Sequence, residues 1–514
     1  MAENITPFSV TSPGFFGLNT SDSPVDMSPN FALIADNCVI DKSGRISSRK
    51  GWTPSHASNS DLGTSNITCI GELVENNGSA TKLATGGGFL FKLSGTTLVT
   101  LTYGGGGVAP TIGANNWKFV QLNGIAIFWQ RTFDPLIYDP AVSTTTFRRL
   151  NEKSGTTGTV YQCNEALSAY GRIWAADTST DKQTVVWSDL LTPHIWTGGT
   201  AGSLNLANLW PAGGDEIVAL SSHNNFLYIF GKRQILIYQG ADDPSTMKLA
   251  DTIVGIGCIA RDSVQNIGED VVFLANDGVR SLMRTIQEKS APTRTISKNV
   301  NTDILELVSV ENLENVKSGY SKNNTIYVLT FPATAITYCF DTRTPLEDGS
   351  MRVTTWSQIN PKSMCDCSDG SFRIGKAGYI GDHTGYIDNT DFYRMSYFTT
   401  WVDFGNPIQT SILKKVILTI IGLSNQTIVF KWAYDFLQSY FSDTQVLSGV
   451  SAPSEYGSAE YGISEYSGDV TVRTIRVNGS SSGKVLQFGF EAQINAYQVS
   501  VQRIDLYTKD GRLQ

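Results

Sequence analysis

The sequence has few charged side chains and no long run of apolar ones. Asp, Glu, Lys and Arg make up 17 % of the 514 residues, and 47 acidic against 39 basic residues give a net charge of −8. The longest aliphatic run, residues 416–423, is less than half of the roughly 20 residues that a membrane-spanning helix needs. No basic stretch precedes an apolar one at the N-terminus, so no secretory signal is expected. These absences predict a soluble protein that folds where it is made.

Clusters of nucleic-acid-binding and metal-binding residues are also missing. Lys and Arg never stand more than two in a row, whereas a nucleic-acid-binding face needs clustered cations to neutralise phosphates. The seven cysteines are odd in number and mostly scattered, which favours reduced, buried thiols over a disulfide framework. Cys365 and Cys367 place two sulfurs on one side of a strand, but no second pair completes a zinc site. We therefore expect no metal and no cofactor.

Single residues that could carry chemistry have a simpler structural interpretation. The four histidines show no zinc-site spacing and are expected at turns or at the surface: His56, His194, His223 and His383. Carboxylates in the middle of the chain could pair as in a glycosidase, although acidic turn residues are common: Asp177, Asp181, Asp189 and Glu216. A group of tryptophans could stack sugars, but core packing explains them better: Trp174, Trp187, Trp196 and Trp210. No catalytic residue is predicted, and the chain is expected not to be an enzyme.

Two glycine-containing motifs are interpreted in the same way. Residues 479–483 match the Gly-x-Ser-x-Gly pattern of a nucleophile elbow, which requires a strand before the serine and a helix after it. Here strands are expected on both sides, so the segment is predicted to be a hairpin loop. The four glycines at 104–107 lack the Lys-Ser/Thr and the helix of a phosphate-binding loop. They are predicted to form a flexible turn.

Abundant glycine and aromatic residues accompany a repeated pattern of apolar strand, polar turn and apolar strand. The pattern occurs seven times, with an average step of about 49 residues that is close to propeller repeats. Strand pairs are expected at 82–84 with 89–91, 125–129 with 136–138, 172–176 with 185–187, 226–230 with 235–238, 271–275 with 279–282, 326–329 with 336–340, and 378–380 with 386–387. This spacing predicts an all-β protein with a β-propeller of six to eight blades. A stack of β-sandwich domains is the alternative.

Few helices are expected. Ser28 could cap a short helix over 28–35 with Pro29 at its first position. A second helix is expected over 299–316, where Ile304, Leu307 and Leu313 share one face. Between 37 and 49 the sequence predicts strand, turn and strand, with the turn at 41–44.

The hairpin spacing stops after residue 389, and alternating strands are expected at 416–420, 427–432, 471–477, 486–490 and 499–507. They predict a separate β-sandwich-like module. The Ser-, Gly-, Tyr- and Glu-rich segment 448–468 is expected to be a long polar loop that a partner orders. The expected domains are an extended arm with a hairpin at 1–65, a propeller at 66–390 and the β-sandwich-like module at 391–514.

Several motifs, taken in their order, resemble the tail nozzle proteins of short-tailed bacteriophages (podoviruses), also called tail tubular protein B. The resemblance covers most of the chain, and each motif alone is weak. The motifs are Gly17-Leu18-Asn19, the run from Phe31 to Trp52, Tyr170-Gly171-Arg172-Ile173-Trp174 with Val186-Trp187-Ser188-Asp189, residues 226–238, Gly257-Cys258-Ile259-Ala260, Asp277-Gly278-Val279, and residues 487–490 with 505–507.

The resemblance implies a structural virion protein without catalytic residues. Such a subunit forms a ring, typically a hexamer, below the head-to-tail adaptor, and the ring makes the distal part of the tail tube. The implied partners are further copies, adaptor proteins, and tail fibre, spike or needle proteins, and genomic DNA passes through the channel during ejection without specific binding. The resemblance also implies that the protein assembles in the host cytoplasm and ends up in the tail of the virion. The competing functions are a tail-associated glycan hydrolase and a receptor-binding propeller acting on host polysaccharide.

Overall fold

The computed structural model describes residues 5–113, 116–287, 295–404, 409–422, 426–447 and 472–513. Strands account for 52 % of the structure and helices for 5 %, which confirms the all-β prediction. The polar segment 448–468 lies outside the described residues. No helix in the described ranges is long and apolar enough to cross a membrane.

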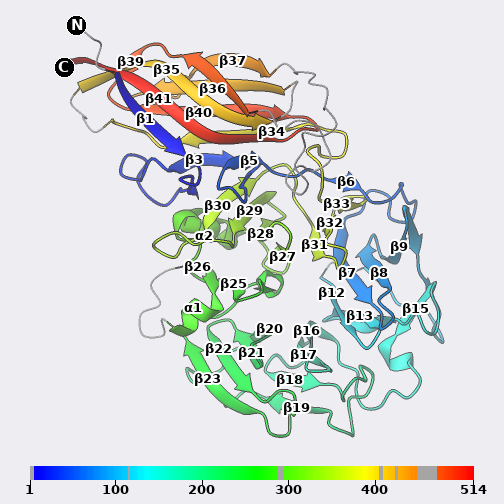
Figure 1. Ribbon diagram of the computed structural model, residues 1–514. Coiled ribbons are helices and arrows are strands. Elements are labelled where there is room, and N and C mark those ends of the chain that lie inside the picture. The colour runs from blue at the N-terminus through cyan, green and yellow to red at the C-terminus, as the bar shows by residue number, and fades with distance from the viewer. Residues whose placement is uncertain are drawn as a thin grey trace. The chain divides into compact units, whose positions relative to one another are not determined.

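The chain forms two compact units, and each of them is discontinuous in sequence (Figure 1). The first unit contains residues 1–53, 336–359 and 384–514, and the second contains residues 54–335 and 360–383. The expected boundaries at residues 65 and 390 differ from this division. The N-terminal arm belongs with the C-terminal strands because β1 (Ile5–Thr11) pairs antiparallel with β41 (Val499–Leu513). Pairing between the two ends of the chain does not alter the spacing of local hairpins, so the sequence pattern did not predict it.

The second unit is a β-propeller in which six blades are sheets of their own. Most blades are antiparallel meanders, the pattern expected when short apolar strands alternate with tight turns. The blades are β7 (Ile67–Val74), β8 (Ala80–Gly86), β9 (Phe89–Ser94) and β10 (Thr97–Thr100); β11 (Thr102–Tyr103) with β12 (Lys118–Leu122), β13 (Ile125–Gln130), β14 (Phe133–Tyr138) and β15 (Thr146–Arg149); β16 (Cys163–Ala169), β17 (Arg172–Thr178), β18 (Thr184–Trp187) and β19 (Gly202–Asn205); β20 (Ile217–His223), β21 (Phe226–Gly231), β22 (Gln234–Gln239) and β23 (Lys248–Val254); β24 (Gln265–Asn266), β25 (Val271–Ala275) and β26 (Gly278–Ser281); and β31 (Ser363–Asp366), β32 (Phe372–Gly375) and β33 (Ile380–Asp382).

The blades follow one another around a ring, as Figure 1 shows. Their first strands make contact in the order β31, β7, β12, β16 and β20. The antiparallel pair β27 (Lys317–Ser321) and β28 (Ile326–Phe331) lies between β24 and β31, since β27 contacts both strands. The short helix η2 (Arg261–Ser263) contacts both β20 and β27. The first strands of the blades therefore surround the middle of the propeller.

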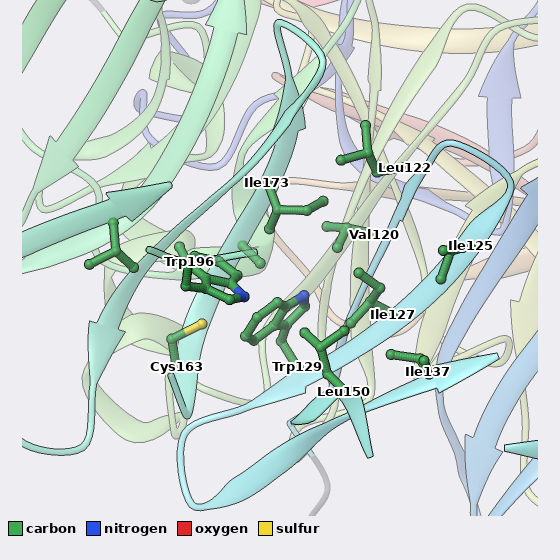
Figure 2. Packing of buried hydrophobic residues seen from close by; sticks show 13 residues of the cluster. Val120, Leu122, Ile125, Ile127, Trp129, Ile137, Leu150, Cys163, Ile173 and Trp196 are labelled. Atoms are coloured by element: carbon green, nitrogen blue, oxygen red, sulfur yellow. The ribbon is translucent and has the colours of Figure 1, made fainter. Parts of the chain in front are cut away.

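Apolar side chains fill the spaces between neighbouring blades. Figure 2 shows one such core, in which Ile127 and Trp129 of one blade lie near Ile173 and Trp196 of the next. The rings of Trp129 and Trp196 are 5.8 Å apart in an edge-to-face arrangement, which is a preferred geometry for aromatic pairs. Because both faces of an inner strand are covered, β13 is buried along nearly its whole length. This explains why apolar and polar residues do not alternate along the sequence of such a strand.

The predicted hairpins are largely confirmed. The first five are the pairs β8–β9, β13–β14, β17–β18, β21–β22 and β25–β26. Residues 326–329 lie in β28, and residues 336–340 lie in β29 of the first unit. The seventh prediction is wrong, because β33 pairs with β32, which precedes it, and residues 386–387 form no strand. Here the propeller has ended and the chain has entered the first unit.

The first unit contains strands from both ends of the chain and from the 336–359 segment. One sheet has the order β38-β35-β41-β5-β4, with β1 on β41 and β39 on β35, and another orders β29-β30-β2-β3-β34-β40-β36-β37. Burial alternates along β35 and β36, as expected for sheets that bury one face each. The strands are β2 (Gly17–Leu18), β3 (Phe31–Asp36), β4 (Cys38–Ile40), β5 (Ile46–Ser48), β29 (Ile336–Asp341), β30 (Arg352–Trp356), β34 (Tyr393–Thr399), β35 (Gln409–Gly422), β36 (Gln426–Tyr434), β37 (Phe441–Leu447), β38 (Val472–Asn478), β39 (Ser482–Gly483) and β40 (Leu486–Ile494), and β6 (Thr53–Pro54) stands where the chain enters the second unit.

The helix predicted over 28–35 is wrong, because residues 31–36 form β3. Ala32 and Ala35 are fully buried in this strand, which pairs with β2 and β34. Long-range pairing therefore overrides the local capping signal of Ser28 and Pro29. The neighbouring strand–turn–strand prediction is confirmed: β4 pairs with β5, and the Asp41 carboxylate accepts the backbone N–H groups of the turn.

The helix predicted over 299–316 is present but shorter. After η3 (Lys298–Val300), helix α2 spans Asn301–Val310 and buries Ile304 and Leu307. Leu313 and Val316 lie beyond its C-terminal end. The remaining helices within the described residues are α1 (Leu282–Gln287) and η1 (Leu150–Glu152).

Gly278 is required by the turn between β25 and β26. Its φ is +124°, and an added Cβ would stand 1.9 Å from Asn301 Oδ1 and 2.7 Å from Ser297 Oγ. We expect Gly278→Val to lower the free energy of unfolding by about 1–3 kcal/mol, because backbone strain and the contact with α2 combine. Urea denaturation would measure this loss. Gly255→Val is the matched control, since Gly255 also has positive φ but open space around it; equal losses for the two variants would contradict the predicted contact.

Candidate functional site

A polar cavity of about 420 Å³ lies among the first strands of the propeller blades. Its walls come from β7, β12, β27 and β31, together with Asp262 of η2. Each of these strands contributes a few side chains, so residues far apart in sequence meet there. The cavity and its surrounding charges are the candidate site of this protein.

A buried cluster of charged groups stands beside this cavity. Arg261 Nη2 lies 2.6 Å from Asp262 Oδ2, and the Lys317 ammonium group binds the same carboxylate oxygen. Lys118 Nζ lies 3.6 Å from Asp262 Oδ1 and also 3.6 Å from Glu165 Oε2. Three cations thus surround two carboxylates. The arrangement holds together three strands, β12, β16 and β27, and the short helix η2.

Two asparagine residues complete the hydrogen bonding of Arg261. The guanidinium donates to the Asn164 backbone oxygen at 2.6 Å and to Asn116 Oδ1 at 2.7 Å. Asn164 Nδ2 in turn donates to Asp177 Oδ2 at 3.0 Å. Arg131 pairs with Asp177 and, at 3.0 Å, with Glu314. Buried charges require such partners, because an unpaired one costs several kcal/mol.

The pKa values of the two carboxylates in the cluster are shifted in opposite directions. Burial raises the pKa of Glu165 to about 7, although Lys118 and Arg261 oppose the rise. Burial also acts to raise the pKa of Asp262, but Arg261, Lys317 and Lys118 hold it well below its usual range. The difference follows from contact: Asp262 accepts direct hydrogen bonds, whereas Glu165 Oε2 has no hydrogen-bond partner. Glu165 is therefore the group in this cluster that changes charge near neutral pH.

The four carboxylates considered for a glycosidase are each held in other contacts. Asp177 is in the Arg131 ion pair, and Asp181 accepts the hydroxyl of Thr184. Asp189 accepts both the N–H and the hydroxyl of Thr200. Glu216 pairs with two exposed lysines, Lys182 and Lys232. In the hydrogen bonds and ion pairs of the described residues, none of these four carboxylates is paired with another of the four.

Three of the four histidines are buried, which contradicts a surface position, but of these three only His223 lies in a strand. His56, His223 and His383 expose 4 %, 8 % and 6 % of their surface. His56 shows why: its Nε2 accepts the backbone N–H of Ile380 at 2.9 Å, and its ring packs 5.6 Å from Tyr379. Burial lowers the pKa of His56, so its ring is held neutral. His194 is only partly buried.

The tryptophan prediction is confirmed, because all four rings are buried in cores between or within blades: Trp174, Trp187, Trp196 and Trp210. The Gly-x-Ser-x-Gly segment 479–483 lies between β38 and β40 and contains β39, so no helix follows the serine. Residues 104–107 form a turn without a following helix. Neither motif has the surroundings that its chemistry requires.

All seven cysteines are free thiols, as the odd count predicted. Within the described ranges, no group of three or more His, Cys, Asp or Glu residues is arranged to hold a metal ion. Three of the thiols, Cys69, Cys365 and Cys367, line the central cavity. The sequence analysis predicted only that Cys365 and Cys367 lie together, and not that Cys69 lies near them.

No protein-family profile and no curated protein matches the chain. Among solved structures, the extracellular domain of the one component system BT4673 from B. thetaiotaomicron has a TM-score of 0.41 at 9 % identity, and the match covers 67 % of this chain and 41 % of that one. PorZ, a surface component of the type-IX secretion system of Porphyromonas gingivalis, gives 0.36 at 11 % identity, covering 68 % and 43 %. The Neurospora crassa Pan2 WD40 domain gives 0.38 at 10 % identity, covering 67 % and 98 %. The chain thus spans about two fifths of the length of the first two structures.

Proposed function

We propose that the chain is a structural subunit of the tail of a short-tailed bacteriophage, a nozzle protein that forms a ring through which the genome leaves. The observation that carries the proposal is the order of the nozzle-like motifs, which begin at Gly17 and end at Tyr507. They fall in both units of the fold. In this proposal the subunit acts by assembly and carries out no catalysis.

The longest of these motifs has a structural role in the first unit. Asn37 and Arg49 both lie in the run from Phe31 to Trp52, and they hydrogen-bond each other at 2.9 Å. Arg49 also forms two hydrogen bonds with Asp388, and Asn37 donates to the backbone oxygen of Arg394. The motif therefore ties the N-terminal strands to the segment after residue 384. The contacts of this motif are internal to the fold, and such a role is in keeping with a structural protein.

Electron cryomicroscopy of the purified full-length chain tests the proposal. We expect closed rings, typically of six copies, with an open channel along the symmetry axis. Mass photometry across a concentration series would give the copy number independently. A chain that stays monomeric at high concentration, and that is absent from purified virions probed with an antibody against it, would overturn the proposal.

The proposed channel also predicts weak binding to DNA. Each chain carries a net charge of −8, and a passage for DNA must not hold phosphates along its length. We expect affinity for duplex DNA weaker than ordinary non-specific binding, which is about 10⁻⁴ to 10⁻⁶ M at physiological salt. Fluorescence anisotropy across a salt series would measure it. Micromolar binding that persists at high salt would contradict a passive conduit.

A further inference from the structure

The segment that follows β6 links the last blade of the propeller to the first. In this closing segment, residues 55–62, the backbone N–H of Ser55 donates to Ile380 O of β33 at 2.8 Å. Two residues later, the N–H of Ala57 donates to Thr96 O, between β9 and β10, at 3.1 Å. β33 belongs to the last blade, whereas β9 and β10 belong to the first. The closing segment therefore helps to complete the ring of blades.

His56 adds a second hydrogen bond between the closing segment and β33. Its Nε2 lies 2.9 Å from the backbone nitrogen of Ile380, and its Nδ1 lies 2.7 Å from Ala57 O. A backbone N–H can only donate, and a carbonyl oxygen can only accept. Nε2 must therefore be the acceptor and Nδ1 must carry the proton. The two contacts together require one tautomer of the neutral imidazole.

Protonation of His56 would remove this acceptor. The imidazolium ring carries an N–H at both nitrogens, so Nε2 would direct a proton at the N–H of Ile380. His56 is 4 % exposed and Ile380 is completely buried, so water cannot take the place of the lost partner unless the segment moves. An unpaired buried N–H and a buried charge are both costly. The closed position of the segment is therefore compatible only with neutral His56.

The charged groups near His56 do not compensate a positive charge on its ring. The titratable residues on the closing segment, on the β9–β10 hairpin and on residues 372–383 are Asp61, Lys92, Arg373, Lys376, Tyr379, Asp382 and His383. Arg373 and Asp382 lie 3.6 Å from each other, and Asp61 accepts the hydroxyl of Thr100 at 2.5 Å. Among the residues that the structure describes, none of this set forms an ion pair with His56.

We propose that His56 makes the closure of the propeller sensitive to acid. Neutral His56 holds the closing segment against the last blade, and protonation of Nε2 by solvent detaches the segment. In the detached state the ring is hydrated and keeps its proton. The proposal does not depend on the proposed function in a phage tail, because it follows from the hydrogen bonds of a single chain.

The sign and size of the effect follow from the proton balance. A hydrated His56 in the detached segment has the ordinary pKa of about 6.5, whereas burial lowers the pKa of His56 in the closed segment. The stability of the closed position is therefore complete above pH 6.5 and is lost as the pH falls toward the lowered value. Between pH 7.5 and pH 5 the detached fraction should rise by up to about 30-fold, because each pH unit below 6.5 favours it by up to tenfold.

Hydrogen exchange of the full-length chain, followed by mass spectrometry at pH 7.5 and pH 5, tests the proposal. Each rate is divided by the intrinsic exchange rate at that pH. We expect the protection of residues 55–62 and of the Ile380 amide to fall by about 10- to 30-fold at pH 5. The blade of β20 to β23 is the internal reference and should keep its protection. Equal protection of the closing segment at both pH values would overturn the proposal.

Two variants separate His56 from the other histidines. His56→Gln keeps a neutral side chain whose oxygen can accept an N–H, so it should abolish the pH dependence of the closing segment. His223→Gln is the matched control: His223 is also buried, but its Nε2 lies 3.0 Å from Glu269 O, a bond that a protonated ring can still donate. This control should leave the pH dependence of the closing segment unchanged. Persistence of that dependence in His56→Gln would contradict the assignment.

The wild-type ring gives a further measurement that needs no variant, should His56→Gln fail to fold. Nuclear magnetic resonance of the full chain, with ¹⁵N in the rings of its four histidines, distinguishes the two neutral tautomers. We expect His56 to carry its proton on Nδ1 at pH 7.5 and to charge only as the closing segment loses protection. A proton on Nε2 at pH 7.5, or a charged ring in a segment that stays protected, would overturn the proposal.

Discussion

Arg49→Ala should lower the free energy of unfolding of the first unit by about 3–5 kcal/mol, the cost of breaking a buried ion pair from one side. The Arg49 side chain is completely buried, and its two guanidinium nitrogens lie 2.9 and 2.6 Å from the two Asp388 oxygens. The guanidinium also covers the ring of Tyr393, with 3.9 Å between Cζ and the ring centroid. Alanine would remove these contacts and leave the Asp388 carboxylate, 11 % exposed, without its cation.

Urea denaturation followed by circular dichroism would measure this loss. Arg394→Ala is the control, because the Arg394 side chain is 68 % exposed and its pair with Glu491 spans 3.6 Å. Its effect should stay below about 1 kcal/mol, as for other surface pairs. Adding Asp388→Asn to Arg49→Ala should recover part of the loss, since the uncompensated charge is then gone. A change of under about 1 kcal/mol for Arg49→Ala would show that the pair is not needed for stability.

The blades were largely predictable because their signals are local. In residues 226–238, two apolar strands enclose a short polar turn, and the structure pairs Phe230 with Ile235 across it. Neighbouring residues make such a hairpin, so composition and turn chemistry suffice to identify it. The strands of the C-terminal part were predicted for the same reason. Alternating burial in β35 and β36 matches the alternation in their sequences.

Errors occurred where distant segments determine the local structure. Residues 31–36 form a strand because they pair with β34, more than 350 residues later. The charged cluster of the propeller was missed for a similar reason: Lys118, Glu165 and Lys317 lie on three different strands. The one local signal was a glutamate in the otherwise weakly polar strand Cys163–Ala169. A charged side chain in an inner strand of a predicted propeller would have indicated a buried partner.

Glu165→Gln should change how the free energy of unfolding depends on pH. The Glu165 side chain is 1 % exposed, and its pKa is raised from 4.5 to about 7, chiefly by burial. Between these values the folded chain keeps a proton that the unfolded chain releases. The stability contributed by protonated Glu165 is therefore complete below pH 4.5 and is lost as the pH rises through 7. Glutamine is neutral throughout and escapes this loss.

The expected size follows from about 1.4 kcal/mol per pKa unit. The free energy of unfolding of Glu165→Gln, relative to the wild type, should rise by about 3 kcal/mol between pH 4.5 and pH 8. Urea denaturation at several pH values would measure it. Glu216→Gln is the control of opposite sign: its lysine partners lower the pKa of Glu216, so the wild type gains stability from this group as the pH rises. That effect should be small, because the Glu216 side chain is 42 % exposed. Parallel pH curves for Glu165→Gln and the wild type would show that Glu165 stays ionised among Lys118, Arg261 and Asp262, and that the cluster tolerates two buried carboxylates at neutral pH.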